Sequence, residues 1–401
     1  MEIRRPNHTM GATSNSRLKS KRKWCHMPTL IATAAFGLES VVKWEVANLG
    51  FSNIKCFDGR VEFSPQQDSE LLAAITRANI WLRSADRVLI KMGEFAATTF
   101  DSLFEQVKAL PWDQWIPKDG KFTVMGKSVQ SGLFSTPDVQ AITKKAVVEK
   151  LKQKYKVSWF AETGAEYTIR ISLHKDIAIL TLDTTGVGRG LHKRGYRARA
   201  GDAPLKETMA AALIDIARYR PNQVFLDPCC GSGTLPIEAA MRAKNIAPGL
   251  ARSFASEAWP TVPDSCWKAT RTEAYAAIRT DVAPEIYGSD ISPAAIELAQ
   301  ANAELAGVDD CVKFEVRPAA EVVLPAEKGV SIINPPYGER LGQIKEVENL
   351  YAELGRMFNR TGWAVYVLTP DEFFETAYNK KARAKRKLFN GMIKTDYYQY
   401  F

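Results

Sequence analysis

The chain has 401 residues, too many for one average domain, and its 46% apolar and 25% charged residues are typical of ordinary globular proteins. The formal net charge of +9 permits a polyanionic partner, whereas no apolar run is long enough to predict a membrane span, so we expect no membrane partner. The six cysteines lack CxxC spacing and the four histidines form no ligand pattern, which argues against a metal site. Because no secretory signal is visible, we expect reduced thiols and a cytoplasmic location.

The chain begins with a basic tail. Residues 1–27 contain seven Lys and Arg against one acid, together with several Ser and Asn and no apolar periodicity. Such a composition cannot bury enough apolar surface to fold, so we predict that residues 1–27 are disordered.

Residues 28–185 alternate between short strand and helix patterns. Apolar periodicity predicts strands over 29–34, 54–57, 60–63, 88–92, 121–129, 167–173 and 177–182, and helices over 38–48, 69–82, 99–110 and 136–155. Asp58-Gly59 predicts a tight turn that joins the second and third of these strands. We therefore predict an α+β N-terminal half over residues 28–185.

A basic, glycine-rich linker follows over residues 186–202. It contains five glycines and is the densest basic segment outside the termini. A purely flexible linker needs neither this charge nor an embedded tyrosine, so we predict that Arg194, Tyr196 and Arg197 contact the phosphate backbone of a nucleic acid.

Residues 203–401 open with a helix over 205–217 and the stretch VFLDPCCGSGTLPIEAA, which starts at Val224. An apolar strand ends in Asp227, Gly231 and Gly233 break the chain, and a helix pattern begins. Glycines in such a turn let backbone N–H groups approach a ligand closely, which is typical of a nucleotide-type cofactor site. The stretch is neither the phosphate loop GxxxxGK[ST] nor strict GxGxxG, so nucleoside triphosphates and ordinary dinucleotides are disfavoured.

Strand and helix patterns alternate through the rest of this domain. Further strands are expected at 286–290, 312–316, 329–333 and 363–368, a helix at 293–306, and a terminal hairpin around Asn390-Gly391. This alternation predicts a doubly wound, mostly parallel sheet whose ligands bind at the carboxyl ends of the strands. Asp227, Asp290 and Asn334 all fall at such ends, and an acid at the position of Asp290 suits a ribose hydroxyl pair.

The fourth strand of this domain runs into Asn334-Pro335-Pro336-Tyr337. The prolines remove N–H donors, so carbonyl oxygens and the asparagine side chain are presented as acceptors. Two acceptors that face an amino group can accept hydrogen bonds from both of its N–H groups. These bonds orient the nitrogen lone pair toward an electrophile such as a methyl sulfonium. Tyr337 offers a ring on which a planar base can stack.

Taken together, DPCCGSGT, GSDISPAAIELAQANAELAGV and INPPYGERL resemble the S-adenosylmethionine (SAM)-dependent amino methyltransferases. The segments LHKRGYR and PLKETMAAAL resemble those of the 23S rRNA guanine-N2 methyltransferases of the RlmL type, and GKSVQSGLFSTPDVQAITKKAVVEKL is similar to the end of their THUMP domain. The resemblance covers roughly residues 28–401 and implies a Rossmann-like class I methyltransferase domain over 203–401. It also implies a ferredoxin-like subdomain over 28–70 and an RNA-binding THUMP domain over 71–185, with one methyltransferase domain at this length.

Residue by residue, the resemblance implies roles in cofactor binding, catalysis and RNA contact. Asp227, Gly231, Gly233, Asp290 and Thr208 would bind SAM, while Asn334, Pro335 and Tyr337 would hold the target amine and base. Lys127, Lys144 and Lys145 in the THUMP-like stretch would contact RNA, and the Lys380–Lys387 cluster would add affinity that is independent of RNA sequence. The implied activity is methyl transfer to the exocyclic N2 of a guanine, with 23S rRNA or a ribosomal assembly intermediate as partner.

One departure and several alternatives remain. The family commonly has an acid after the third strand that holds the adenine amine, but Pro318 occupies that place here, so the backbone or Glu321 is expected to replace it. The Asn-Pro-Pro-Tyr motif alone also fits tRNA guanine-N2, DNA adenine-N6 and protein glutamine-N5 methyltransferases, and a non-catalytic RNA-binding protein is an alternative from another class. The α+β N-terminal half with its basic faces favours RNA.

Overall fold

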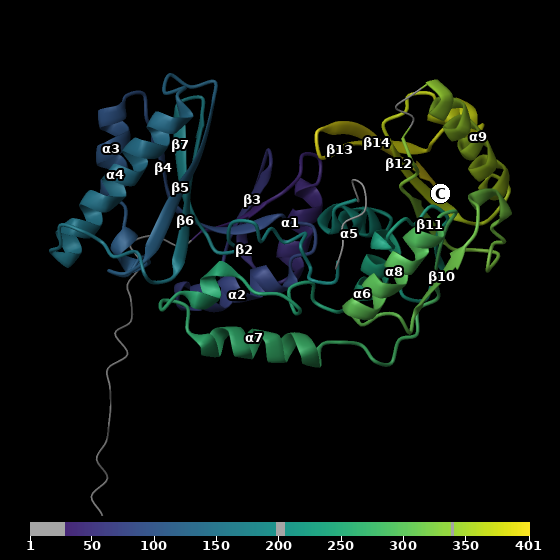
Figure 1. Ribbon diagram of the computed structural model, residues 1–401, viewed down its shortest axis with the longest axis horizontal. Coiled ribbons are helices and arrows are strands. Elements are labelled where there is room, and N and C mark those ends of the chain that lie inside the picture. Colours follow the sequence, from purple (N-terminus) through teal and green to yellow (C-terminus); the bar gives the residue numbers. More distant parts are fainter. Residues whose placement is uncertain (1–28, 198–204, 338–340) are drawn as a thin grey trace, which may run out of the picture.

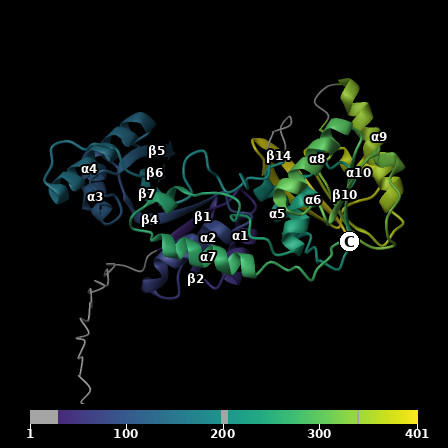
Figure 2. The same ribbon diagram turned by 60° about the horizontal axis from the view of Figure 1, so that its bottom comes forward.

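The computed structural model describes residues 29–197, 205–337 and 341–401. The tail predicted to be disordered therefore lies outside the described residues, as does the end of the basic linker. Figures 1 and 2 show an elongated molecule in which residues 100–155 (blue) lie at one end, residues 30–64 (purple) in the middle and the C-terminal domain (green to yellow) at the other end. No helix within the described residues is long and apolar enough to cross a bilayer.

The N-terminal half is built on one seven-stranded sheet with the order β2-β3-β1-β4-β7-β6-β5. β4 joins its two parts, because residues 87–90 pair with β1 and residues 89–96 pair with β7. The strands are β1 (Leu30–Thr33), β2 (Ser52–Phe57), β3 (Arg60–Ser64), β4 (Arg87–Ala96), β5 (Lys121–Val129), β6 (Glu166–His174) and β7 (Ile177–Asp183). The helices are α1 (Glu39–Asn48), α2 (Leu71–Trp81), α3 (Phe100–Ala109) and α4 (Thr136–Tyr155), with short 3-10 turns at Asp68–Glu70 and Trp112–Gln114.

The C-terminal domain has a second seven-stranded sheet with the order β10-β9-β8-β11-β12-β14-β13. The five strands β8 to β12 are mutually parallel, and β14 joins them antiparallel to β12, which confirms the predicted mostly parallel sheet. The strands are β8 (Phe225–Asp227), β9 (Ile286–Asp290), β10 (Val312–Val316), β11 (Val330–Ile333), β12 (Ala364–Thr369), β13 (Ala384–Asn390) and β14 (Ile393–Tyr400). The helices are α5 (Glu207–Ile216), α6 (Thr234–Ala243), α7 (Asp264–Ala276), α8 (Pro293–Ala306), α9 (Leu341–Phe358) and α10 (Phe374–Tyr378), with 3-10 turns at Ala255–Ala258 and Ala319–Glu321.

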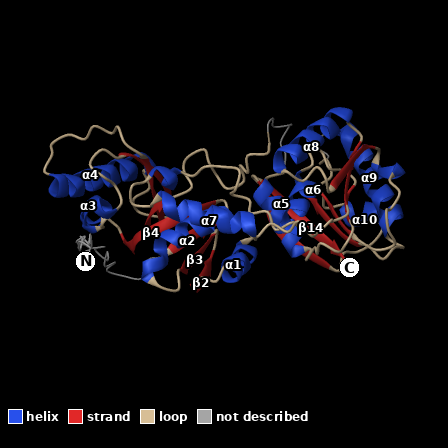
Figure 3. Ribbon diagram, turned by 90° about the horizontal axis from the view of Figure 1, so that it is seen from below, coloured by secondary structure: helices blue, strands red, loops and turns tan. Residues whose placement is uncertain are grey.

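Helices cover both faces of this second sheet. Buried side chains of α5, α6 and α8 form one core with it and those of α9 and α10 form another, so that helices (blue in Figure 3) flank the strands (red). α8 shows how the sequence fixes a helix. The Ser292 side chain accepts from the Ala295 N–H at 3.3 Å, Pro293 occupies the first turn, and Gly307 ends the helix in the left-handed conformation.

The segment between α6 and β9 leaves the C-terminal domain and packs on the N-terminal half. α7 lies along α2, where the Thr76 and Thr270 hydroxyls are 2.7 Å apart (Figures 1 and 2). Trp259 stacks on Tyr167 with ring centroids 4.7 Å apart, and its indole N–H donates to the Glu166 carbonyl at 2.9 Å. Truncating a buried aromatic side chain such as that of Trp259 lowers the free energy of unfolding by about 3–5 kcal/mol. The contacts of this segment therefore hold the two halves of the molecule against each other. No element was predicted here from the sequence.

Candidate active site

The three predicted polar residues meet at one edge of the C-terminal sheet. β9, β8 and β11 are neighbouring parallel strands, and they end in Asp290, Asp227 and the residue before Asn334. Because the carboxyl ends of parallel strands share an edge, the glycine-rich turn and the Asn-Pro-Pro-Tyr segment face the same crevice.

The glycine-rich turn is held to Asp290 by hydrogen bonds. The Gly231 N–H donates to Asp290 Oδ2 at 2.9 Å, and the Ser292 N–H donates to Asp290 Oδ1 at 3.0 Å. Gly231 has φ +52° and Gly233 has φ +81°, and a Cβ on Gly233 would lie 2.9 Å from a ring carbon of Phe314. Each carboxylate oxygen has a further lone-pair position, so Asp290 retains the capacity to accept a pair of hydroxyl groups.

Asp227 is a buried carboxyl group with 1% of its surface exposed. Burial, together with the nearby charge of Asp290, raises the pKa of Asp227 well above its ordinary value, although the Cys229 N–H donates to its Oδ1 at 3.1 Å. None of the protein groups that set this pKa is a cation. An ammonium group of a ligand placed here would lower the pKa again and recover the ionised form, which fits the methionine end of SAM.

The Asn-Pro-Pro-Tyr segment is ordered by its own side chains. The Tyr337 hydroxyl donates to Asn334 Oδ1 at 2.7 Å, and Asn390 Nδ2 donates to the Tyr337 oxygen at 3.4 Å. Burial raises the pKa of Tyr337, so its hydroxyl stays protonated and able to donate. Asn334 Oδ1 keeps one lone-pair position for a substrate N–H. Pro335 is buried.

Pro318, which stands where the resemblance leads us to expect an acid for the adenine amine, follows β10 and precedes a 3-10 turn. The Arg317 N–H donates to the Asp290 carbonyl at 2.9 Å, which draws the chain after β10 toward the crevice. Glu321 lies in the following 3-10 turn and is exposed. Its contact with an adenine stays a prediction.

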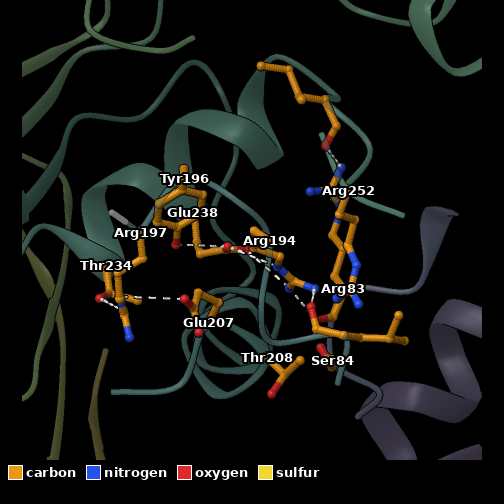
Figure 4. A network of polar contacts seen from close by, with 12 residues as sticks. Arg83, Ser84, Arg194, Tyr196, Arg197, Glu207, Thr208, Thr234, Glu238 and Arg252 are labelled. Atoms are coloured by element: carbon orange, nitrogen blue, oxygen red, sulfur yellow. Dashed lines mark hydrogen bonds and ion pairs between the residues drawn. The ribbon is translucent and has the colours of Figure 1, made fainter. Parts of the chain in front are cut away.

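Arg194 and Tyr196 do not lie where the sequence analysis expected them. Both are 2% exposed, so the prediction that they contact RNA is wrong for this structure. Arg194 Nε lies 3.2 Å from Glu238 Oε1, and the Tyr196 hydroxyl donates to the same oxygen at 3.2 Å (Figure 4). The guanidinium also donates to the carbonyls of Leu191 and Arg83. The charge of Arg194 therefore compensates a buried carboxylate on α6 and links α6 to the N-terminal half.

Arg197 is half-buried beside this network. Its Nη2 donates to Thr234 Oγ1 at 2.7 Å, and its Nε lies 3.5 Å from Glu207 Oε1 (Figure 4). These contacts hold the start of α5 against the start of α6. An RNA contact of Arg197 would compete with them.

Other predicted residues are accessible. Lys127 on β5 and Lys144 and Lys145 on α4 are exposed, which is compatible with RNA contact. Thr208 is 3% exposed and its hydroxyl donates to Asp86 Oδ1 at 3.1 Å, so a direct role in cofactor binding stays a prediction.

Asn390 and Asp86 were not predicted as site residues from the sequence. Both take their places only when the sheet order is known, because Asn390 comes from the terminal hairpin and Asp86 from the N-terminal half. Within the described residues no group of three or more His, Cys, Asp or Glu side chains is placed to hold a metal ion.

Models of three protein families match consecutive parts of the chain. They are the RlmL ferredoxin-like domain over residues 29–89, the THUMP domain over 97–183 and the RMKL-like methyltransferase domain over 194–399.

Relatives and solved structures extend this similarity over nearly the whole chain. "Putative RNA methyltransferase YpsC" of Bacillus subtilis is 50% identical over 93% of this chain and 96% of its own length. The ribosomal RNA large subunit methyltransferase K/L of Psychromonas ingrahamii is 34% identical over 90% of this chain, which spans only 48% of that longer protein. The crystal structure of SMU.472, described as "a putative methyltransferase complexed with SAH", is 43% identical, with a TM-score of 0.87 over 93% of this chain and 98% of that one.

Proposed function

Because this chain belongs to the family of THUMP-containing, RlmL-like class I methyltransferases, we propose that it methylates RNA. The reaction is SAM-dependent transfer of a methyl group to the exocyclic N2 of a guanine in 23S rRNA. SAH bound to a relative that is 43% identical supports the cofactor, and the rRNA methyltransferase K/L at 34% identity supports the substrate class.

The observation that carries this proposal is the shared edge of Asp227, Asp290 and Asn334. Asp227 would hold the ammonium of the methionine end and Asp290 the ribose hydroxyls, and the backbone of the turn that contains Gly231 and Gly233 would line the cofactor. SAM supplies, when bound, a methyl group on a positively charged sulfur, which is already a strong electrophile.

The residues of the Asn-Pro-Pro-Tyr segment would align the target amine. Asn334 Oδ1 and the Pro335 carbonyl would accept both N–H groups of the amine, which directs its lone pair into the crevice. The Tyr337 hydroxyl fixes the asparagine oxygen at 2.7 Å, while its ring would stack on a base that has been brought out of its own stack. The N–C bond would form as the methyl–sulfur bond breaks and SAH leaves with the electron pair. Since the electrophile is activated, the attack itself needs no general base, and the methylated amine would lose its extra proton to solvent afterwards.

Exposed Lys127, Lys144 and Lys145 support RNA as the partner, because they place positive charge on the THUMP module. A DNA adenine or protein glutamine substrate would use the same acceptors at the amine and gain nothing specific from this module.

Steady-state methylation of an unmodified 23S rRNA transcript tests the role of Asn334. We expect Asn334→Ala to lower kcat/KM by about 10²- to 10³-fold, as when one preorganised polar group is lost from an active site, while SAH affinity is retained. Asn359→Ala is the matched control, since Asn359 is also half-buried and donates to the Tyr378 carbonyl at 2.9 Å far from the crevice. Equal activity of the two variants would refute the role of Asn334.

A further inference from the structure

A cavity of about 470 Å³ lies beside the candidate active site, between the loop that joins β1 to α1 and the turn that joins β13 to β14. Figure 1 shows the β13–β14 hairpin next to the N-terminal half. Phe36 and Asp86 line it from the N-terminal half, and Lys206, Phe389 and Asn390 line it from the C-terminal domain. Its volume is in the range of pockets that bind small molecules.

Fixed contacts hold the two sides of this cavity together. The Arg386 guanidinium donates to the Gly37 carbonyl at 2.7 and 3.0 Å and to the Ser40 hydroxyl at 2.7 Å. Gly37 has φ +88°, and a Cβ there would lie 2.6 Å from the Lys387 carbonyl oxygen, so only glycine allows this approach. The cavity is therefore a built feature of the molecule.

One wall is aromatic and open. The rings of Phe36 and Phe389 meet edge to face with centroids 5.7 Å apart, yet Phe36 is 57% exposed. Exposed aromatic rings of this kind stack on the bases of single-stranded nucleic acids. Lys387 and Lys394 on the adjoining hairpin are exposed and add positive charge for a phosphate backbone.

The other lining groups match the polar edge of a base. Asp86 Oδ1 accepts from the Thr208 hydroxyl at 3.1 Å, and a carboxylate with four lone-pair positions can accept further donors. Lys206 is exposed and offers three donors, while the Asn390 amide offers both donor and acceptor. Stacking and edge contacts together can distinguish one base from another.

Asn390 connects the cavity to the active site. Its Nδ2 donates to the Tyr337 hydroxyl at 3.4 Å, so the cavity lies on the hydroxyl side of Tyr337. We propose that this cavity binds the base of a nucleotide that flanks the methylated one, with Phe36 as its stacking platform. The proposal rests on the proposed function, because it assigns part of the RNA substrate.

The test compares Phe36→Ala, Phe36→Trp and Tyr275→Ala in the full-length protein. Tyr275 on α7 is the matched control, since it is 59% exposed and lies away from the cavity. The measurements are kcat/KM for methylation of unmodified 23S rRNA transcript and the dissociation constant of SAH. We expect Phe36→Ala to lower kcat/KM by about 5- to 150-fold, the usual effect of losing one stacked base, and Phe36→Trp to restore it.

The outcomes separate this proposal from the proposed function. If Phe36→Ala matches Tyr275→Ala while the wild-type protein methylates RNA, the cavity is not a base site and the proposed function stands. If Phe36→Ala weakens SAH binding, the cavity belongs to the cofactor and the proposal fails. If the wild-type protein binds SAH but methylates no RNA, both proposals fail together. Unchanged SAH affinity with a lowered kcat/KM supports the cavity as an RNA base site.

Discussion

Removing the Arg194 guanidinium should destabilise the protein, because the charge of Glu238 would then be buried without a partner. The side chains of Arg194 and Glu238 are 2% and 0% exposed, and Nε and Oε1 lie 3.2 Å apart. Breaking a pair buried to this degree costs about 3–5 kcal/mol. We therefore expect Arg194→Ala to lower the free energy of unfolding by about 3–5 kcal/mol.

A double-mutant cycle isolates the ionic part of this effect. Glu238→Gln keeps the size of the side chain and removes its charge, while Arg194 keeps the carbonyls of Leu191 and Arg83 as acceptors. The double variant should therefore lose less than the sum of the single variants, by about 1 kcal/mol or more.

Urea unfolding followed by circular dichroism measures these changes, and Arg189→Ala is the matched control. Arg189 is an exposed arginine of the same segment and should leave the unfolding midpoint unchanged. If Arg194→Ala were as stable as Arg189→Ala and instead lost affinity for RNA, the burial-based account of Arg194 would be refuted.

Three further predictions concern pH, cofactor binding and salt. Burial lowers the pKa of His192 from 6.5 to about 4. The stability that the neutral imidazole of His192 contributes is therefore complete above pH 6.5 and is lost as the pH falls toward 4. His192→Asn should accordingly show a smaller drop in Tm between pH 7.5 and 5 than the wild-type protein. Gly233→Ala should abolish SAH binding in calorimetry, because the new Cβ would lie 2.9 Å from an aromatic ring carbon of β10, whereas Gly307→Ala, which meets nothing within 4 Å, should retain it. Replacing both Lys144 and Lys145 by Ala should reduce the slope of log K against log salt for RNA binding by about 1 to 2, and an unchanged slope would remove these lysines from the interface.

Local patterns predicted much of the fold. α4 and β5 have the bounds expected from sequence, because a proline in the first helical turn and the alternation of side chains depend only on neighbours along the chain. The edge shared by Asp227, Asp290 and Asn334 was predictable for a different reason, since strand order in a doubly wound sheet follows a general rule.

Long-range contacts account for what the sequence did not show. α7 was not predicted because its segment buries Trp259 and Trp267 against the N-terminal half. A local sequence pattern does not show which distant part of the chain covers these side chains. The prediction for Arg194 and Tyr196 was wrong because a basic segment has the same sequence pattern whether its side chains bind RNA or contact a buried acid. Glu238 stands between the apolar residues Ile237 and Ala239 of α6, and this was the available signal that a buried cation was required.

Mass spectrometry of the nucleosides of unmodified 23S rRNA, after reaction with the pure protein and SAM, tests the proposed activity most directly. The account predicts N2-methylguanosine as the product, formed by the wild-type protein and lost in Asn334→Ala that still binds SAH. Methylated adenosine as the product, or no methylated nucleoside from a protein that binds SAH, would contradict it.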